Sequence, residues 1–136
     1  MNMAKTYNGT TINDSATFTA EAGAVIAGPF MALAFDKDGK LIPATDKVVP
    51  LGLTVAETDE KLAAGEDVTV QIKEQGVWTS GGAFAAGDLL ASDASGHAVK
   101  AASGKFVLAV ALEAASAEGE TVKVQITKSG YAAATA

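Results

Sequence analysis

The sequence contains no cysteine and no arginine, and it contains a single histidine and a single tryptophan. Without cysteine, disulfides, thiolate catalysis and cysteine-based metal sites are excluded. Without arginine, and with a net charge of −6, the chain lacks the cationic groups that neutralise phosphates. We therefore expect no binding to nucleic acid and none to an anionic membrane surface.

Long apolar runs are missing as well. No stretch approaches the roughly 20 apolar residues that a membrane helix needs. Residues 1–7 are polar, and no apolar segment of a secretory signal follows them. We therefore expect a soluble protein that is made in a cytoplasm. Aromatic residues make up 6 % of the 136 residues and hydrophobic residues 49 %, which predicts one domain with a core of Val, Ile, Leu and Ala.

What the sequence does contain is an internal repeat. Residues 65–72 (GEDVTVQI) match residues 119–126 (GETVKVQI) at six of eight positions. Upstream blocks match in the same order in both halves of the chain. The sequence therefore predicts that residues 22–72 and 82–126 are two copies of one supersecondary unit.

Each copy has the patterns of β-strands. Apolar and polar residues alternate along residues 68–73 and 122–127, which is the period of a half-buried strand. An apolar run, an Asp-x-x-Gly turn and a return strand predict a hairpin in each copy. Two apolar runs are expected to form central strands: 48–55 and 106–112. Helix signals are weak and limited to one turn within residues 56–64.

These patterns predict an all-β chain that forms a single compact β-sandwich or β-barrel-like domain built from two related halves, with an N-terminal arm. Residues 1–20 are expected to form that arm or an edge strand. Residues 21–130 are expected to form the β domain, and residues 131–136 a frayed C-terminus.

Four large side chains are candidate partner contacts. Tyr7, Ile12 and Phe18 are spaced through the polar N-terminal stretch, as in an arm that becomes ordered on a partner surface. Trp78 lies in the bridge between the two copies, where it is either a core residue or an interface anchor. The sequence leaves these two roles of Trp78 open.

Reactive groups are few. His97 is the one histidine, and the serines near it lack the G-x-S-x-G motif of a nucleophile elbow. Residues 36–39 begin like an EF-hand loop, but Lys40, Leu41 and Lys47 stand where that loop needs a ligand, a glycine and a glutamate. We expect no catalytic residue, no metal site, no cofactor and no enzyme activity.

A family resemblance rests on short motifs along nearly the whole chain. They are MAKTY (3–7), AGAV (22–25), GVW (76–78), AAGDLL (85–90), LAVALEAA (108–115) and GETVKV (119–124). In this order the sequence resembles the small all-β decoration, or cement, proteins of tailed phages. Ala109 departs from the pattern, because glycine is common at this position in the family.

The resemblance implies a virion structural protein that binds the exterior of the assembled phage capsid and stabilises it. Its partner would be the major capsid protein, and it would act as a homotrimer on the outer capsid surface after synthesis in the cytoplasm of the bacterial host. A head-fibre or other virion accessory β module is the alternative. A lipoyl- or biotinyl-like carrier domain with Lys37 on its hairpin, an enzyme and a carbohydrate-binding module are less favoured.

Overall fold

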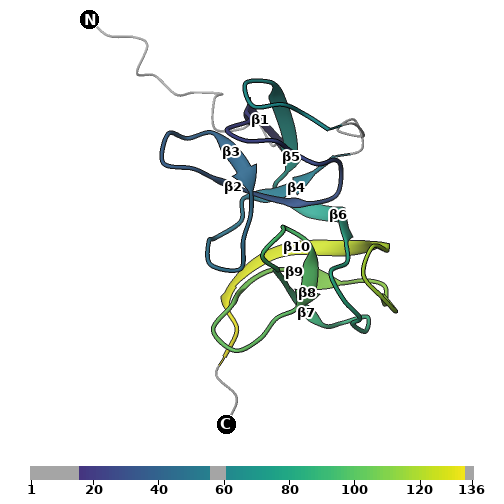
Figure 1. Ribbon diagram of the computed structural model, residues 1–136. Coiled ribbons are helices and arrows are strands. Elements are labelled where there is room, and N and C mark those ends of the chain that lie inside the picture. Colours follow the sequence, from purple (N-terminus) through teal and green to yellow (C-terminus); the bar gives the residue numbers. More distant parts are fainter. Residues whose placement is uncertain (1–15, 56–60, 134–136) are drawn as a thin grey trace, which may run out of the picture.

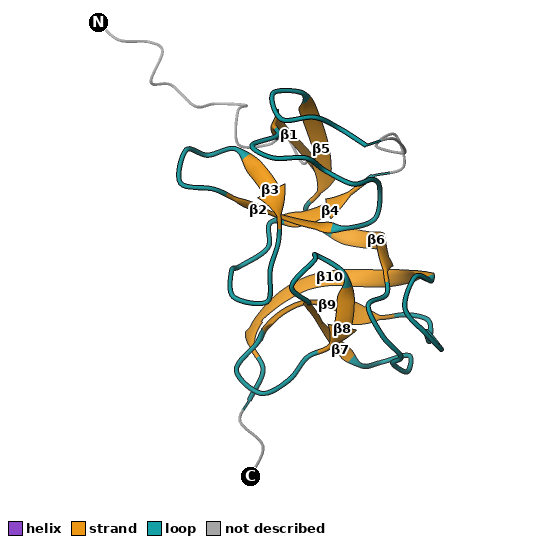
Figure 2. Ribbon diagram, in the orientation of Figure 1, coloured by secondary structure: helices purple, strands orange, loops and turns teal. Residues whose placement is uncertain are grey.

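The computed structural model describes residues 16–55 and 61–133. The described residues form two five-stranded antiparallel sheets that pack as a sandwich, and they contain no helix (Figures 1 and 2). The first half of the chain forms one sheet and the second half forms the other, which Figure 1 shows below it. The predicted all-β class is confirmed.

The two sheets share one topology. The first has the order β1-β5-β4-β2-β3 and the second has the order β6-β10-β9-β7-β8, so the strands correspond one to one. The first sheet consists of β1 (Thr17–Glu21), β2 (Ala32–Phe35), β3 (Leu41–Pro43), β4 (Gly52–Thr54) and β5 (Asp67–Gln71). The second consists of β6 (Glu74–Thr79), β7 (Leu89–Ser92), β8 (Ala98–Lys100), β9 (Phe106–Ala111) and β10 (Thr121–Tyr131).

Each sheet curls until its two edges meet. Ala22, just after β1, forms a parallel bridge with Leu41 of β3. Ser80, just after β6, forms the matching bridge with Ala98 of β8. This closure gives each half a barrel-like interior and removes much of the open strand edge on which other chains could add.

Each hairpin turn is stabilised by an aspartate side chain that accepts hydrogen bonds from backbone N–H groups of the turn. Asp36 Oδ1 accepts hydrogen bonds from the backbone N–H groups two and four residues later, at 2.8 and 2.9 Å. Asp93 Oδ1 does the same at 2.8 and 2.9 Å. Gly39 and Gly96 close these turns with φ values of 80° and 85°, which glycine adopts without a steric penalty.

The core has two parts. One fills the interior of the first half: Ala22, Ile26, Met31, Leu33, Leu41, Val68 and Val70. The other fills the second half and also includes residues of the first half, namely Ala32, Ala34, Ala44 and Leu53. Because this second cluster has members in both sheets, it couples them. Burying one Val, Leu or Ile side chain contributes roughly 1.5–3 kcal/mol.

One expectation needs adjustment. Within the predicted central strand 48–55, only Gly52–Thr54 forms β4, because Pro50 interrupts the run and lacks the N–H that a central strand donates. Val48 and Val49 are exposed. β4 and β9 do lie at the centres of their sheets, as predicted.

The structure also describes the ends of the predicted β domain. β1 begins within the predicted arm or edge strand and forms an edge strand paired with β5. β10 continues to Tyr131, which pairs with Phe106 beyond a bulge. Most of the predicted helical turn at residues 56–64 falls outside the described residues.

Candidate functional site

Trp78 is a core residue. Its side chain is 0 % exposed, and its indole N–H donates to the Gly96 carbonyl at 2.9 Å. The structure thus decides between the two roles that the sequence left open, because a fully buried ring is not available to a partner.

Phe18 is the predicted contact residue that the structure places at the surface. It is 41 % exposed on β1, and its ring centroid lies 5.8 Å from that of Phe35 in an edge-to-face arrangement. Phe35 is 47 % exposed. Tyr7 and Ile12 lie outside the described residues. The two phenylalanines form an exposed apolar pair on β1 and β2.

The exposure of Phe35 was not predicted, because this residue lies in an apolar run that is typical of a buried strand. Other large apolar side chains are exposed as well: Val25, Val48, Val49, Leu89, Leu112 and Tyr131.

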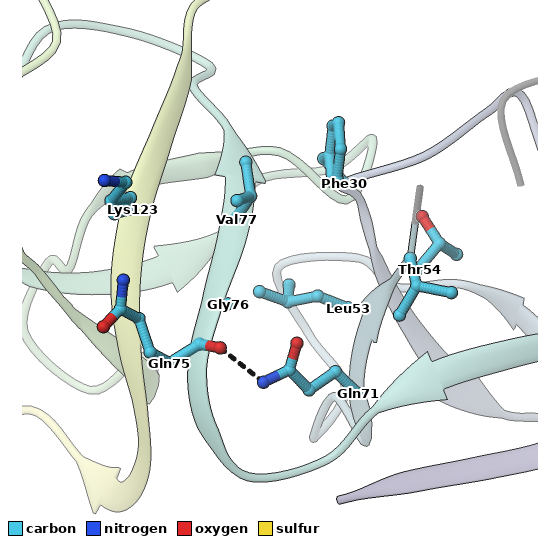
Figure 3. A pocket seen from close by; sticks show the side chains of 9 residues that line it. Phe30, Leu53, Thr54, Gln71, Gln75, Gly76, Val77 and Lys123 are labelled. Atoms are coloured by element: carbon cyan, nitrogen blue, oxygen red, sulfur yellow. Dashed lines mark hydrogen bonds between the residues drawn. The ribbon is translucent and has the colours of Figure 1, made fainter. Parts of the chain in front are cut away.

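A surface pocket of about 210 Å³ lies where the two halves meet (Figure 3). Leu53 and Phe30 come from the first half, and Val77 and Lys123 come from the second. Gln71 donates a side-chain hydrogen bond to the Gln75 carbonyl at the floor of this pocket, as Figure 3 shows. The lining holds one cation and no carboxylate or imidazole, so it does not assemble a general acid and base.

The residues that carry reactive side chains lie in or beside the turns. The His97 backbone N–H donates to Asp93, and the Ser92 hydroxyl donates to the Asp93 carbonyl at 2.9 Å. The Asp36 carboxylate, which opens the EF-hand-like segment, accepts two backbone N–H groups of its own turn. Within residues 16–55 and 61–133, no group of three or more His, Asp or Glu side chains gathers to hold a metal ion.

Ion pairs and hydrogen bonds shift three titratable groups. Glu21 lies 2.7 Å from Lys40 and raises the pKa of that ammonium group by hydrogen bonding and by charge. Lys105 lies 3.2 Å from Asp46 and lowers the pKa of its carboxyl group, mainly through their hydrogen bond. Hydrogen bonds from Ser116, and then from the Ala117 N–H, lower the pKa of Glu120. Each of these groups braces a loop. Asp46 and Lys105 also line two surface pockets, of about 280 and 190 Å³.

This arrangement suits adhesion to another surface. It combines closed sheets, exposed apolar side chains and carboxylates that are engaged in turns. The sequence profile of the phage cement proteins matches residues 10–126. The chain belongs to the phage cement protein family. Membership makes it a capsid-binding decoration protein of a phage virion, located at the capsid surface, in a family with a structural role.

The cement protein also shares its fold with a solved virion component. The crystal structure of the N base of head fibre gp8.5 of bacteriophage phi29 matches with a TM-score of 0.63 at 24 % identity. The match covers 84 % of this chain and 95 % of that one. No curated protein matches the chain. Among the described residues, no helix is long and apolar enough to cross a membrane.

Proposed function

We propose that this cement protein is non-enzymatic, binds the major capsid protein on the outside of the assembled shell, and acts there as a homotrimer. The observation that carries the proposal is the family match over residues 10–126. A trimer that touches several capsid subunits gains affinity from effective concentration, even if each contact is weak. Because it binds the intact lattice better than separated subunits, it stabilises the shell.

The surface of the described chain is consistent with this role. Phe18 and Phe35 present apolar rings to solvent on the first half, and the acidic charge of the chain favours contact with basic loops of a shell. Tyr7 and Ile12 are the proposed capsid contacts, and Phe18 is the proposed contact to another copy of the chain. Because Trp78 is buried, it supports the body of the protein instead.

The test is binding to capsids. Purified protein should co-sediment with expanded capsids of its phage and raise their disruption temperature. Deleting residues 2–15 leaves β1 intact and removes Tyr7 and Ile12. We expect this deletion to weaken capsid binding while thermal unfolding of the protein stays the same.

Val25→Ser is the matched control, because Val25 is exposed in the loop that follows β1 and is not one of the proposed contacts. It should bind like the unaltered protein. Absence of binding to every capsid form would refute the capsid role, and unchanged binding after the deletion would remove Tyr7 and Ile12 from it.

A second candidate is the base of a head fibre. The fold shared with the gp8.5 N base favours it. A fibre base also binds the capsid, so electron micrographs of labelled virions separate the two: a cement protein labels the whole shell, whereas a fibre base labels the bottom of projecting fibres.

A further inference from the structure

The two halves of the chain meet through two different faces. On the first half, the contact surface lies on β2 and β4 and includes Ala32 and Leu53; we call it the β2–β4 face. On the second half it lies on β6 and the β7–β8 turn and includes Gly76 and Gly96; we call it the β6 face. The Ala32 N–H donates to the Gly96 carbonyl at 2.8 Å. A Cβ at Gly76 would lie 3.4 Å from Leu53 Cδ1.

The β2–β4 face has an equivalent on the second half, on β7 and β9. The pairing Ala32–Leu53 corresponds to the pairing Leu89–Val110. The backbone frame around them is the same, because the hydrogen bond from Phe30 N to Thr54 O has its counterpart from Gly87 N to Ala111 O. Both donors have positive φ, 61° and 90°. We call the surface formed by Leu89 and Val110 the β7–β9 face.

The β6 face likewise has an equivalent on the first half, on β1 and the β2–β3 turn. Val70 and Val124 occupy equivalent positions of the repeat at residues 65–72 and 119–126. Because Phe18 pairs with Val70 and Gly76 pairs with Val124, Phe18 corresponds to Gly76. Gly39 corresponds to Gly96 in the matching aspartate turns. We call the surface formed by Phe18 and Gly39 the β1 face.

The internal contact therefore leaves one copy of each face uncovered. Ala32 is 0 % exposed, whereas its equivalent Leu89 is 46 % exposed. Gly96 is buried against Ala32, whereas a Cβ at Gly39 would meet nothing within 4 Å. Phe18 is exposed where Gly76 is buried. The uncovered faces are the two complementary sides of a contact that this chain already makes once.

We propose that a second copy of the chain covers them: the β7–β9 face of one copy packs on the β1 face of the next, repeating the junction inside each chain. Such a head-to-tail contact is heterologous, and heterologous contacts close into rings when the rotation permits. A homotrimer is a ring of three such contacts. The inference therefore deepens the proposed function, and only the number of copies in the ring rests on that proposal.

The uncovered faces are apolar and carry larger side chains than the faces of the internal junction, so two copies would lie farther apart than the two halves do. Phe18 and Leu89 stand where the internal contact has glycine and alanine, so each uncovered face carries a large apolar residue. The ion pair between Asp46 and Lys105 has no counterpart, because Ser103 and Val48 occupy the equivalent positions. Association between copies should therefore depend little on salt.

The experiment measures mass in solution by light scattering. Phe18→Glu and Leu89→Glu each place a charge on one of the two faces, and Val25→Glu is the control on an exposed loop outside both. We expect the unaltered protein and V25E to form the same oligomer in low and high salt. F18E and L89E should be monomers, and the fluorescence of buried Trp78 shows that they remain folded.

Mixing the two monomeric variants separates this contact from other modes of association. F18E keeps an intact β7–β9 face and L89E keeps an intact β1 face, so their mixture should give a one-to-one dimer that does not grow further. A monomeric unaltered protein, F18E and L89E with unaltered mass, or a mixture that stays monomeric would each overturn the inference.

Capsid binding by the unaltered protein and by V25E distinguishes this inference from the proposed function. Monomers that bind capsids would overturn the head-to-tail contact and leave the capsid role intact. Oligomers that form as predicted and bind no capsid would support the head-to-tail contact and overturn the capsid role.

Discussion

At the scale of single residues, Gly39 and Gly96 show how one local structure is used in two environments. Both close an Asp-x-x-Gly turn with positive φ, 80° and 85°. Gly96 presses against the first half, where a Cβ would lie 2.9 Å from the Ala32 carbonyl oxygen, whereas Gly39 faces open space. The two turns therefore share a conformational requirement and differ in packing.

This pair predicts different costs for the same substitution. Gly39→Ala should lower the free energy of unfolding by about 1–2 kcal/mol, the penalty of a left-handed conformation for an L-residue. Gly96→Ala carries that penalty and also overpacks the junction, which costs roughly 1–3 kcal/mol more. Urea unfolding followed by Trp78 fluorescence measures both values. Equal costs would contradict the packing of Gly96 against Ala32.

At the scale of elements, the Glu120 carboxylate stabilises the connection between β9 and β10. Glu120 accepts hydrogen bonds from the Ser116 hydroxyl at 2.7 Å and from the Ala117 N–H at 2.7 Å. These bonds favour the ionised form and lower the pKa of Glu120. The first half has a simpler version, in which the Ala63 N–H donates to Glu66 at 3.2 Å.

The lowered pKa of Glu120 predicts a pH dependence of stability. In the unfolded chain a glutamate titrates at about 4.3, so the contribution of Glu120 is fully present above that pH and is lost as the pH falls through its lowered folded value. Glu120→Gln should therefore destabilise the protein at pH 7 and much less near pH 3. Urea titrations at both pH values measure this.

Glu118→Gln is the control, because it alters the charge of the same connection two residues away from the capping carboxylate. It should leave the pH dependence close to that of the unaltered protein. An E120Q variant that loses as much stability at pH 3 as at pH 7 would show that the Glu120 hydrogen bonds do not act through ionisation.

At the scale of the whole molecule, the two sheets share a hydrophobic cluster. Ala32 and Leu53 of the first sheet pack with Trp78 and Leu108 of the second. Side chains that bury each other across the junction lose their contacts together, which makes unfolding cooperative.

We therefore predict one unfolding transition for the whole chain. Trp78 fluorescence reports the second half, and far-ultraviolet circular dichroism reports the strands of both. The midpoints and slopes from the two probes should coincide in urea. Two separated transitions by circular dichroism, with fluorescence following one of them, would show that the halves unfold independently.

Much of this fold was predictable because its signals are local. The alternation at residues 68–73 and 122–127 marks strands with one buried face, and the aspartate turns mark hairpins, so β5, β10 and both hairpins follow from a few neighbouring residues. The surface position of Phe18 agreed with its polar surroundings. The exposure of Phe35, Val48 and Val49 was not predictable, because an apolar run looks the same whether or not another element covers it.

By itself, the sequence determined that the chain is built of strands and turns and that its two halves follow one pattern. Only the tertiary structure decided which faces are covered: Trp78 and Gly96 are buried, while Phe18 and Gly39, on equivalent strands and turns, stay exposed. Turn chemistry and alternation act over a few residues. Covering a face needs residues far apart in the chain to meet, as Ala32 and Gly96 do, and no local pattern encodes that meeting.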